Sequence, residues 1–206
     1  MKPMKVLCLM KPMKVLCLTG SVGMGKTTAA RILRRLGIPV HDADAEVHRL
    51  LGAGGAAVKA VEAAFSGVKR GKAIDRAALG RLVFADPAAL RRLEKILHPL
   101  VRQAERKFLA RSRRERQALV VLDIPLLFET GGERRCDGVL VVSAPRAIQL
   151  ARVMARPDMT KARLAAMEAR QLPDAEKRRR ADVVISTGLG KRHSLRALRQ
   201  ALTRFR

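Results

Sequence analysis

The sequence predicts an α/β fold, a five-stranded parallel sheet covered by helices on both faces. Short apolar runs alternate with longer helical segments along the 206-residue chain, an order that is typical of parallel sheets. Hydrophobic residues make up 48% of the chain and charged residues 30%, so a buried core is expected and disorder is not. The length fits one compact domain with a small inserted lobe.

The first elements flank a glycine-rich stretch. An apolar run at 15–18 predicts a buried strand, and a helix is expected from about 26 to 36. Gly37 ends this helix, because glycine adopts the left-handed conformation that is common at helix ends. Further strands are expected at 38–41, 119–124, 139–142 and 183–186, and a final helix at 194–204.

The long segment between the second and third strands indicates an inserted lobe. It looks helical throughout, with breaks near 52–55, 67–71 and 86–87, and it is too large for a plain crossover. We therefore interpret it as a substrate lobe. Charged helical sequence also runs from 145 to about 180. The expected organisation is a single domain over 10–206, with a core at about 10–44, 117–150 and 181–206, the lobe at about 45–116 and a lid at about 151–180.

Nine residues are repeated at the start of the chain. Residues 1–9 read MKPMKVLCL, and residues 10–18 read the same again. The second copy runs directly into the glycine-rich stretch, so it supplies the first strand and the first copy is surplus. We expect Met10 to be the natural start and residues 1–9 to be an artefact. The alternative is an extra strand at the edge of the sheet.

Charge and aromatic content limit the partners. The formal net charge of +25 favours nucleic acid, a membrane surface or phosphorylated metabolites, although a genome bias toward Arg and Ala explains it equally well. The chain has no Trp or Tyr and only five Phe. This argues against a reader of single-stranded RNA, which stacks bases on aromatic rings. Duplex binding through phosphates stays open, but nucleic acid is not the expected partner.

Cysteine spacing and hydropathy predict a cytoplasmic protein. Cys8, Cys17 and Cys136 show no paired spacing, so neither a disulfide framework nor a zinc site is expected. The four His residues are scattered without the spacing of zinc ligands. The N-terminus lacks the long apolar region of a signal peptide. No stretch approaches the roughly 18 apolar residues of a membrane span, so no membrane partner is expected.

The clearest motif is a phosphate-binding loop. Residues 20–27 read GSVGMGKT, which matches G-x-x-x-x-G-K-[ST] between a strand and a helix, the context that a P-loop needs. The glycines let backbone N–H groups surround phosphate oxygens, and the helix N-terminus adds its positive dipole end. Lys26 is expected to reach the β- and γ-phosphates of ATP, and the Thr27 hydroxyl to ligate Mg²⁺. The predicted ATP contacts are Gly23, Met24, Gly25, Lys26, Thr27 and Thr28.

Two carboxylates follow the second predicted strand. Ligands of open parallel sheets sit at the carboxyl ends of the strands, so Asp42 and Asp44 are expected near the P-loop. One can accept a proton from a substrate hydroxyl while the other orders a magnesium water. The equal alternative is that one of them only caps the helix that begins near Ala45.

Residues 123–129 read DIPLLFE and follow the third apolar run. Asp123 ends that strand, an arrangement that can face Mg²⁺, although a loop acid without a metal role is an equal alternative. Leu126 and Phe128 are candidates for contact with the substrate, while core packing is the commoner role of such residues. The predicted metal ligands are Thr27, Asp42 and Asp123.

Basic residues gather in the predicted lid. Arg152 and Arg156 are four residues apart and share one helix face. An arginine there can stabilise the charge that spreads over a transferring phosphate, and a charged lid is a common device of kinases. Most basic residues of this segment are expected on a solvated face. In the lobe, His98 and Arg102 are further candidates, with a structural role the default for His98.

These motifs together resemble the dephospho-coenzyme A kinase family, from about Val15 to Phe205. The P-loop alone occurs in many kinases, but its combination with the stretches after it is specific. The stretches that carry the resemblance are LTGSVGMGKTT at 18–28, DAD at 42–44, LVF at 82–84, LHPL at 97–100, PLLFE at 125–129, residues 150–156, and ADVVI at 181–185 leading to Gly188.

The resemblance implies a P-loop fold like that of the nucleoside monophosphate kinases. It implies transfer of the ATP γ-phosphate to the ribose 3′-hydroxyl of dephospho-coenzyme A, the last step of coenzyme A synthesis. It makes Asp44 the candidate base and one of Arg152 and Arg156 the clamp of the phosphate. Many relatives have Asn-x-Gly near the adenine; Ser186 stands here in place of that Asn, and the implied contacts from the turn are Thr187 and Gly188. The implied substrate contacts are Asp42, Asp44, His98, Arg102, Leu126 and Phe128.

Two other functions stay open at this point. One is a different small-molecule P-loop kinase, acting on a nucleotide or another alcohol. The other, suggested by the charge of +25, is a P-loop ATPase that binds nucleic acid, and such binding would fall steeply with salt. The expected assembly is a monomer or a weak homo-oligomer.

Overall fold

The computed structural model describes residues 12–205, apart from the side chains of residues 84 and 85. Its main feature is a five-stranded sheet in the order β2-β5-β1-β6-β7, in which every pairing is parallel. The predicted parallel sheet is therefore confirmed. Its strands are β1 (Lys14–Thr19), β2 (Val40–Asp42), β5 (Leu119–Asp123), β6 (Gly138–Ser143) and β7 (Val183–Ser186).

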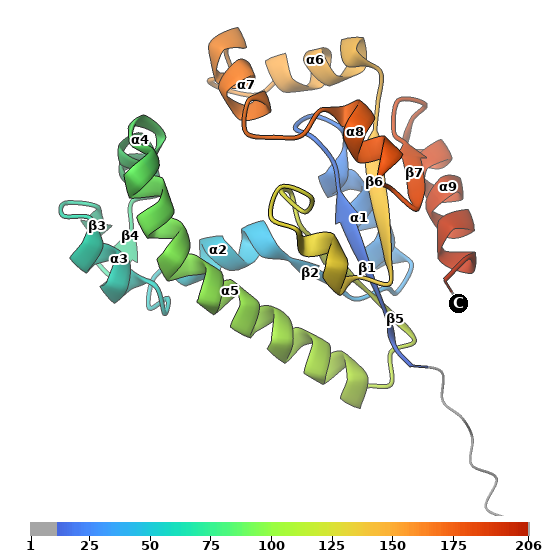
Figure 1. Ribbon diagram of the computed structural model, residues 1–206, viewed down its shortest axis with the longest axis horizontal. Coiled ribbons are helices and arrows are strands. Elements are labelled where there is room, and N and C mark those ends of the chain that lie inside the picture. The colour runs from blue at the N-terminus through green and yellow to red at the C-terminus, as the bar shows by residue number, and fades with distance from the viewer. Residues whose placement is uncertain (1–11, 206) are drawn as a thin grey trace, which may run out of the picture.

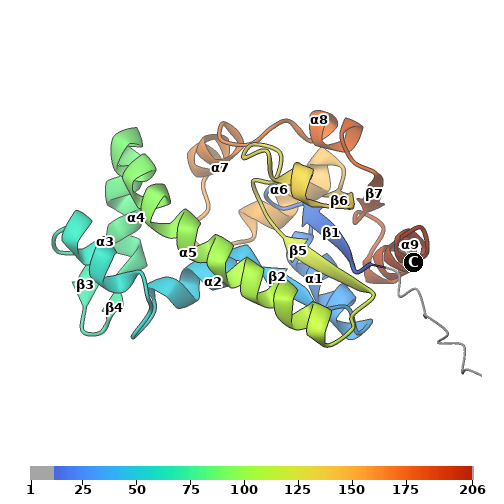
Figure 2. The same ribbon diagram turned by 60° about the horizontal axis from the view of Figure 1, so that its bottom comes forward.

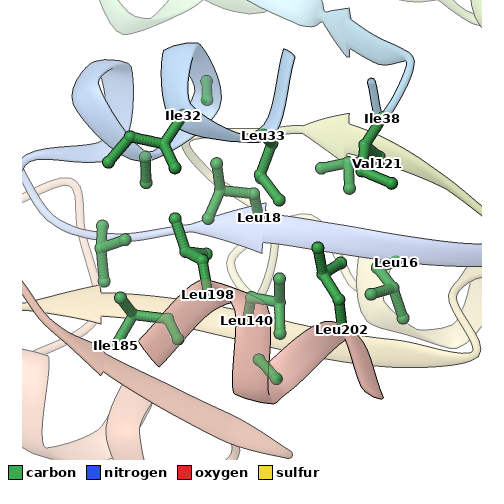
Figure 3. Close-up of a cluster of buried hydrophobic side chains, with 14 of the residues drawn as sticks. Leu16, Leu18, Ile32, Leu33, Ile38, Val121, Leu140, Ile185, Leu198 and Leu202 are labelled. Atoms are coloured by element: carbon green, nitrogen blue, oxygen red, sulfur yellow. The ribbon is translucent and has the colours of Figure 1, made fainter. Parts of the chain in front are cut away.

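Alternating side chains of the strands fill two hydrophobic layers. Leu16 and Leu18 of β1 lie on one face, where they pack with α1 (Lys26–Arg35) and α9 (Lys191–Thr203), as Figure 3 shows. Their neighbours Val15 and Cys17 point to the other face and pack with Leu127 and Phe128. Strands that are apolar on both sides thus bury the centre of the sheet between two layers.

The lobe between β2 and β5 has a hydrophobic core of its own. Residues such as Leu51, Val61 and Phe65 pack there against Leu93 and Leu97 of the long helix α5. The far end of α5 packs against the layer of the sheet that contains Leu127 and Phe128. This helix therefore connects the lobe core with that layer (Figures 1 and 2). The helices are α2 (Ala43–Leu51), α3 (Val58–Ala64), α4 (Arg76–Ala85) and α5 (Pro87–Arg114).

One part of the lobe is not helical, and here the prediction was wrong. A short antiparallel hairpin joins β3 (Lys69–Arg70) to β4 (Ala73–Ile74). Gly71 adopts a φ of +57° in its turn, a left-handed conformation that favours glycine. A glycine-rich break was expected at 67–71, but strands of two residues are too short to leave a periodic pattern.

Three helices follow β6; the first two lie beyond the carboxyl ends of the strands, and the third packs alongside β6 (Figure 1). They are α6 (Arg146–Met154), α7 (Lys161–Glu168) and α8 (Asp174–Arg179), and a 3-10 helix, η1 (Gly132–Arg135), precedes β6. The final helix α9 begins three residues before its predicted start. No helix in the described part of the chain is both long and apolar enough to span a bilayer.

The cysteines differ from the expectation. Cys17 of β1 and Cys136, just before β6, form a disulfide with their Cα atoms 5.9 Å apart. The two residues are 119 positions apart in sequence, and only the parallel pairing of β1 with β6 brings them together. Spacing therefore gave no sign of the pair. Cys8 lies outside the described residues.

The first strand begins in the second copy of the duplicated segment, at Lys14, while residues 1–9 lie outside the described part. Deletion of residues 1–9 is expected to leave the melting temperature and turnover unchanged, because β1 keeps its full length and both of its neighbours. A thermal melt of the two forms checks this. A loss of several degrees in the shortened chain would show that the first copy stabilises the fold.

Candidate functional site

The glycine-rich loop follows β1 and leads directly into α1. Gly20 has no room for a side chain, because a Cβ there would lie 2.3 Å from Val142 Cγ2 and 2.7 Å from the Val142 carbonyl oxygen. Gly23 and Gly25 have φ values of +78° and +89°, which other residues rarely adopt. Packing and backbone geometry thus both require glycine in this loop, and its last glycine, Gly25, is the N-cap of α1.

A polar network fastens the loop to the turn after β7. The Thr187 hydroxyl donates to the Met24 carbonyl at 2.7 Å, and Arg152 donates to Thr187 Oγ1 and to its carbonyl at 3.0 and 2.7 Å. The Met24 side chain is buried, and its Sδ lies 3.2 Å from the Ala144 backbone nitrogen. Of the two residues predicted near the nucleotide, Thr187 therefore contacts the P-loop, whereas Gly188 lies against Pro145.

Lys26 lies beside the buried carboxylate of Asp123. Lys26 Nζ is 2.7 Å from Asp123 Oδ1, and the side chains are 16% and 2% exposed. Burial raises the pKa of Asp123 above its ordinary value, Lys26 opposes this most strongly, and Asp42 and Asp44 add to it. Four charged groups from three strand ends therefore lie within electrostatic reach of one another, as the carboxyl ends of a parallel sheet predict.

The two aspartates after β2 have different surroundings. Asp42 is the N-cap of α2, where its carboxylate accepts from the Ala45 N–H at 3.0 Å, and it lies 3.6 Å from Arg34. Asp44 is exposed and lines the cavity above the P-loop. The sequence left open whether one of these aspartates only caps the helix. In the structure Asp42 caps α2, whereas Asp44 faces the cavity.

The cavity above the P-loop has a volume of about 680 Å³. It brings together Lys26, Asp44 and Arg156, from the P-loop, the start of the lobe and the lid segment. The guanidinium of Arg156 forms no hydrogen bond or ion pair within residues 12–205 and is exposed. Of the predicted site residues, the cavity lining contains Gly23, Gly25, Lys26, Thr27, Thr28, Asp44, Arg152, Arg156 and Thr187.

Several predicted substrate contacts lie elsewhere. Phe128 is buried in the core, with the Arg180 guanidinium 4.6 Å from its ring centroid. Leu126 is half-buried and does not line the cavity. His98 and Arg102 are exposed on α5, also outside the cavity lining.

Residues that the sequence gave no reason to select also line the cavity. Gln171, after α7, accepts from the Val22 N–H of the P-loop at 3.1 Å, and Lys191 borders the cavity from the start of α9. Gln149 of α6 lies outside the cavity lining but also contacts the loop, where it donates to the Val22 carbonyl at 2.8 Å. These contacts span up to 149 positions, and no motif spacing could have indicated them.

The family model and the curated relatives agree on one family. The family model described as dephospho-CoA kinase matches residues 14–190. The dephospho-CoA kinase of Paramagnetospirillum magneticum is 68% identical over 160 residues, 78% of this chain and 76% of that protein. That of Rhodospirillum rubrum is 60% identical over 189 residues, 91% and 90% of the two chains. The crystal structure of TT1252 from Thermus thermophilus has a TM-score of 0.83 at 38% identity, and the match covers 94% of this chain and 97% of that one.

Proposed function

The chain belongs to the dephospho-coenzyme A kinase family, and we propose that the cavity above its P-loop is where it phosphorylates the ribose 3′-hydroxyl of dephospho-coenzyme A. This reaction consumes ATP and is the last step of coenzyme A synthesis. The observation that supports the cavity as the site is that Lys26, Asp44 and Arg156 line it together with the P-loop. ATP on the P-loop, the Asp44 carboxylate and the two cations Lys26 and Arg156 can therefore meet at one transferring phosphate group.

ATP places its β- and γ-phosphates against the N–H groups from Gly23 to Thr28. Lys26 exchanges its Asp123 partner for these phosphates. The helix N-terminus and the Lys26 ammonium then oppose the negative charge of the transferring group. Thr187, which already holds the Met24 carbonyl, keeps the loop in place beside the adenosine.

Magnesium fits the oxygen donors that lie next to Lys26. Thr27 lines the cavity and Asp123 contacts Lys26; a hydroxyl and a carboxylate are ligand types that Mg²⁺ prefers, usually together with phosphates and waters. The ion would neutralise phosphate charge when bound. Asp42 is a weaker candidate than predicted, because its carboxylate already caps α2 and lies near Arg34.

Asp44 accepts the proton of the ribose 3′-hydroxyl. Its carboxylate has no intramolecular bond within the described residues and faces the cavity, so it is free to orient a substrate hydroxyl. Holding that oxygen in line with the γ-phosphorus supplies much of the rate, and the loose transition state needs only a modest base. Closure of the lid over the cavity would exclude water, which otherwise competes as acceptor.

The two lid arginines have separate roles in this proposal. Arg152 is bound to Thr187 and the P-loop, whereas Arg156 is exposed and unpartnered within residues 12–205. Arg156→Ala is therefore expected to lower kcat by roughly 10²- to 10³-fold, with the melting temperature unchanged. Arg152→Ala should instead raise the KM for ATP and lower the melting temperature. Steady-state kinetics and thermal melts check both, and the opposite assignment of effects would reverse the roles.

A coupled assay of ADP release tests the function directly. Turnover with dephospho-coenzyme A but not with AMP is the expected result. Turnover of AMP alone would point to a nucleotide kinase instead. A filter-binding test with nucleic acid in increasing salt measures any phosphate-driven binding separately, because such binding falls steeply with salt.

The domain division and the location are part of the same proposal. The lobe over 45–116 would carry the acceptor substrate, and the lid would include α6 and α7. A cytoplasmic location and a monomer or weak homo-oligomer fit a small enzyme that acts on small molecules. Size-exclusion chromatography with light scattering measures the assembly.

A further inference from the structure

One residue of the P-loop is held at both of its backbone polar groups. The Val22 N–H donates to Gln171 Oε1 at 3.1 Å, and the Val22 carbonyl accepts from Gln149 Nε2 at 2.8 Å. Gln149 belongs to α6 and is buried, whereas Gln171 follows α7 and lines the cavity. Val22 directly precedes Gly23, the first residue of the proposed phosphate contacts. The two glutamines thus fix the backbone of Val22, next to the proposed phosphate contacts.

The position of Gln171 depends on the residue that follows it. The Leu172 N–H donates to Glu129 Oε1 at 2.8 Å, and the Leu172 side chain packs on the core layer that contains Leu127 and Phe128. Glu129 ends the PLLFE stretch after β5. The lid segment is therefore fixed to the loop that follows Asp123 at the residue next to Gln171.

The same carboxylate oxygen lies beside a buried lysine. Lys177 Nζ of α8 is 2.9 Å from Glu129 Oε1, at ion-pair distance although outside hydrogen-bond geometry. The side chains of Lys177 and Glu129 are 0% and 15% exposed. Glu129 Oε2 is buried and lacks a hydrogen-bond partner among residues 12–205.

Three further contacts fix α8 and its C-cap residue, Arg180, to the core. The Ser143 hydroxyl at the end of β6 donates to Asp174 at 2.7 Å. Arg180 pairs with Glu133 of η1 and lies over the Phe128 ring. Helix α8 and the residue after it are thus fastened to β6, η1 and the PLLFE stretch, so the chain that follows Leu172 is fixed to the core.

A buried ion pair is a poor way to gain stability. Removing two charges from water costs several kcal/mol per ion, and apolar replacements of similar size are often neutral or stabilising. A positioning role explains this ion pair better, because Lys177 lies against the Glu129 carboxylate that accepts from the Leu172 N–H. We propose that Glu129 and Lys177 are positioning residues that act through Leu172 and Gln171 to preorganise the P-loop at Val22 for ATP. The inference rests on the proposed function of the cavity.

The test compares ATP binding in four proteins, a double-mutant cycle of Gln171→Ala with Lys177→Met. Methionine fills much of the lysine volume and carries no charge. Each single variant is expected to weaken ATP binding by roughly tenfold and to lower kcat/KM for ATP by roughly 10- to 100-fold, because the loop must be ordered on binding. The double variant should bind ATP no more weakly than the weaker-binding of the two single variants, because both substitutions remove the same support of the P-loop.

A purely structural role predicts a different pattern. It would lower the melting temperature of Lys177→Met while the folded enzyme keeps its ATP affinity, and that result would overturn the proposal. Multiplying effects in the combined variant, or normal ATP affinity of Gln171→Ala, would overturn it as well. If Lys177→Met does not fold, Glu129→Leu combined with Lys177→Met replaces it in the cycle, because the pair of apolar side chains leaves no buried charge.

The matched control is Arg179→Met in the same helix. Arg179 also pairs with a glutamate, Glu176 at 2.9 Å, but its side chain is 78% exposed, so no change in ATP affinity is expected. ATP affinity is measured by titration calorimetry without an acceptor. A wild-type chain that binds ATP but releases no ADP with dephospho-coenzyme A would refute the proposed function alone and leave this cycle readable.

Discussion

Replacement of Lys26 with alanine is expected to abolish phosphoryl transfer. Lys26 is the cation that the P-loop offers to the β- and γ-phosphates, and it acts in a cavity partly shielded from water, where such charges contribute most. A loss of roughly 10³-fold or more in kcat/KM is expected, comparable with the removal of other catalytic cations in phosphoryl transfer. ADP release with dephospho-coenzyme A measures it, and near-normal turnover would refute the role of the loop.

The same substitution also affects stability, which the sequence did not indicate. Lys26 pairs with Asp123, whose side chain is 2% exposed. Removing one partner of a buried ion pair costs about 3–5 kcal/mol, and less is expected here because Lys26 borders the cavity. Lys26→Ala should therefore melt at a lower temperature, and the double variant with Asp123→Asn should recover most of the loss without recovering activity.

The pH dependence of this deficit follows from the pKa of Asp123. Burial already raises that pKa above the ordinary 3.8, and Lys26 is the main opposing influence; without Lys26 it rises further. The folded state then binds a proton that the unfolded state has released, so stability is lost as the pH rises through the folded pKa. The melting temperature of Lys26→Ala should approach that of wild type as the solution is acidified toward pH 4. An unchanged deficit over that range would show that Asp123 is not its cause.

The sheet and the P-loop could be predicted because their signals are local. Leu16 and Leu18 alternate with Val15 and Cys17 between the two core layers, and a glycine-rich strand–helix turn is readable from its residue types alone. The hairpin at Gly71 and the disulfide of Cys17 could not be predicted. The strands of the hairpin are too short to show a periodic hydrophobic pattern, and the disulfide depends on the pairing of strands that are distant in the sequence.

For the candidate site, the sequence indicated which residues follow the strands but not the direction of their side chains. Asp42 and Asp44 follow one strand and both have the residue type of a helix cap, so spacing could not tell which one caps α2. The answer depends on side-chain direction: Asp42 accepts from Ala45 while Asp44 faces the cavity. Gln171 carries no motif at all, and its contact with Val22 joins residues 149 positions apart in the sequence.

Asparagine in place of Asp42 therefore serves as the matched control for Asp44. Asn caps a helix as well as Asp does, and the partly exposed ion pair with Arg34 contributes little. Asp42→Asn should keep most of its activity. Any defect that arises from magnesium waters should ease as the Mg²⁺ concentration is raised.

Asp44→Asn is expected to lower kcat by roughly 10²- to 10⁴-fold, with the KM for ATP little changed. Asparagine keeps the size and shape of the side chain but cannot accept a proton as a carboxylate does. Because Asp42 already caps α2, the substitution leaves the helix N-terminus intact, and the melting temperature should stay near that of wild type. The loss of activity would then arise from chemistry rather than from folding, and added Mg²⁺ should not restore it. If Asp44→Asn is active while Asp42→Asn is inactive at every Mg²⁺ concentration, the roles of the two carboxylates are reversed.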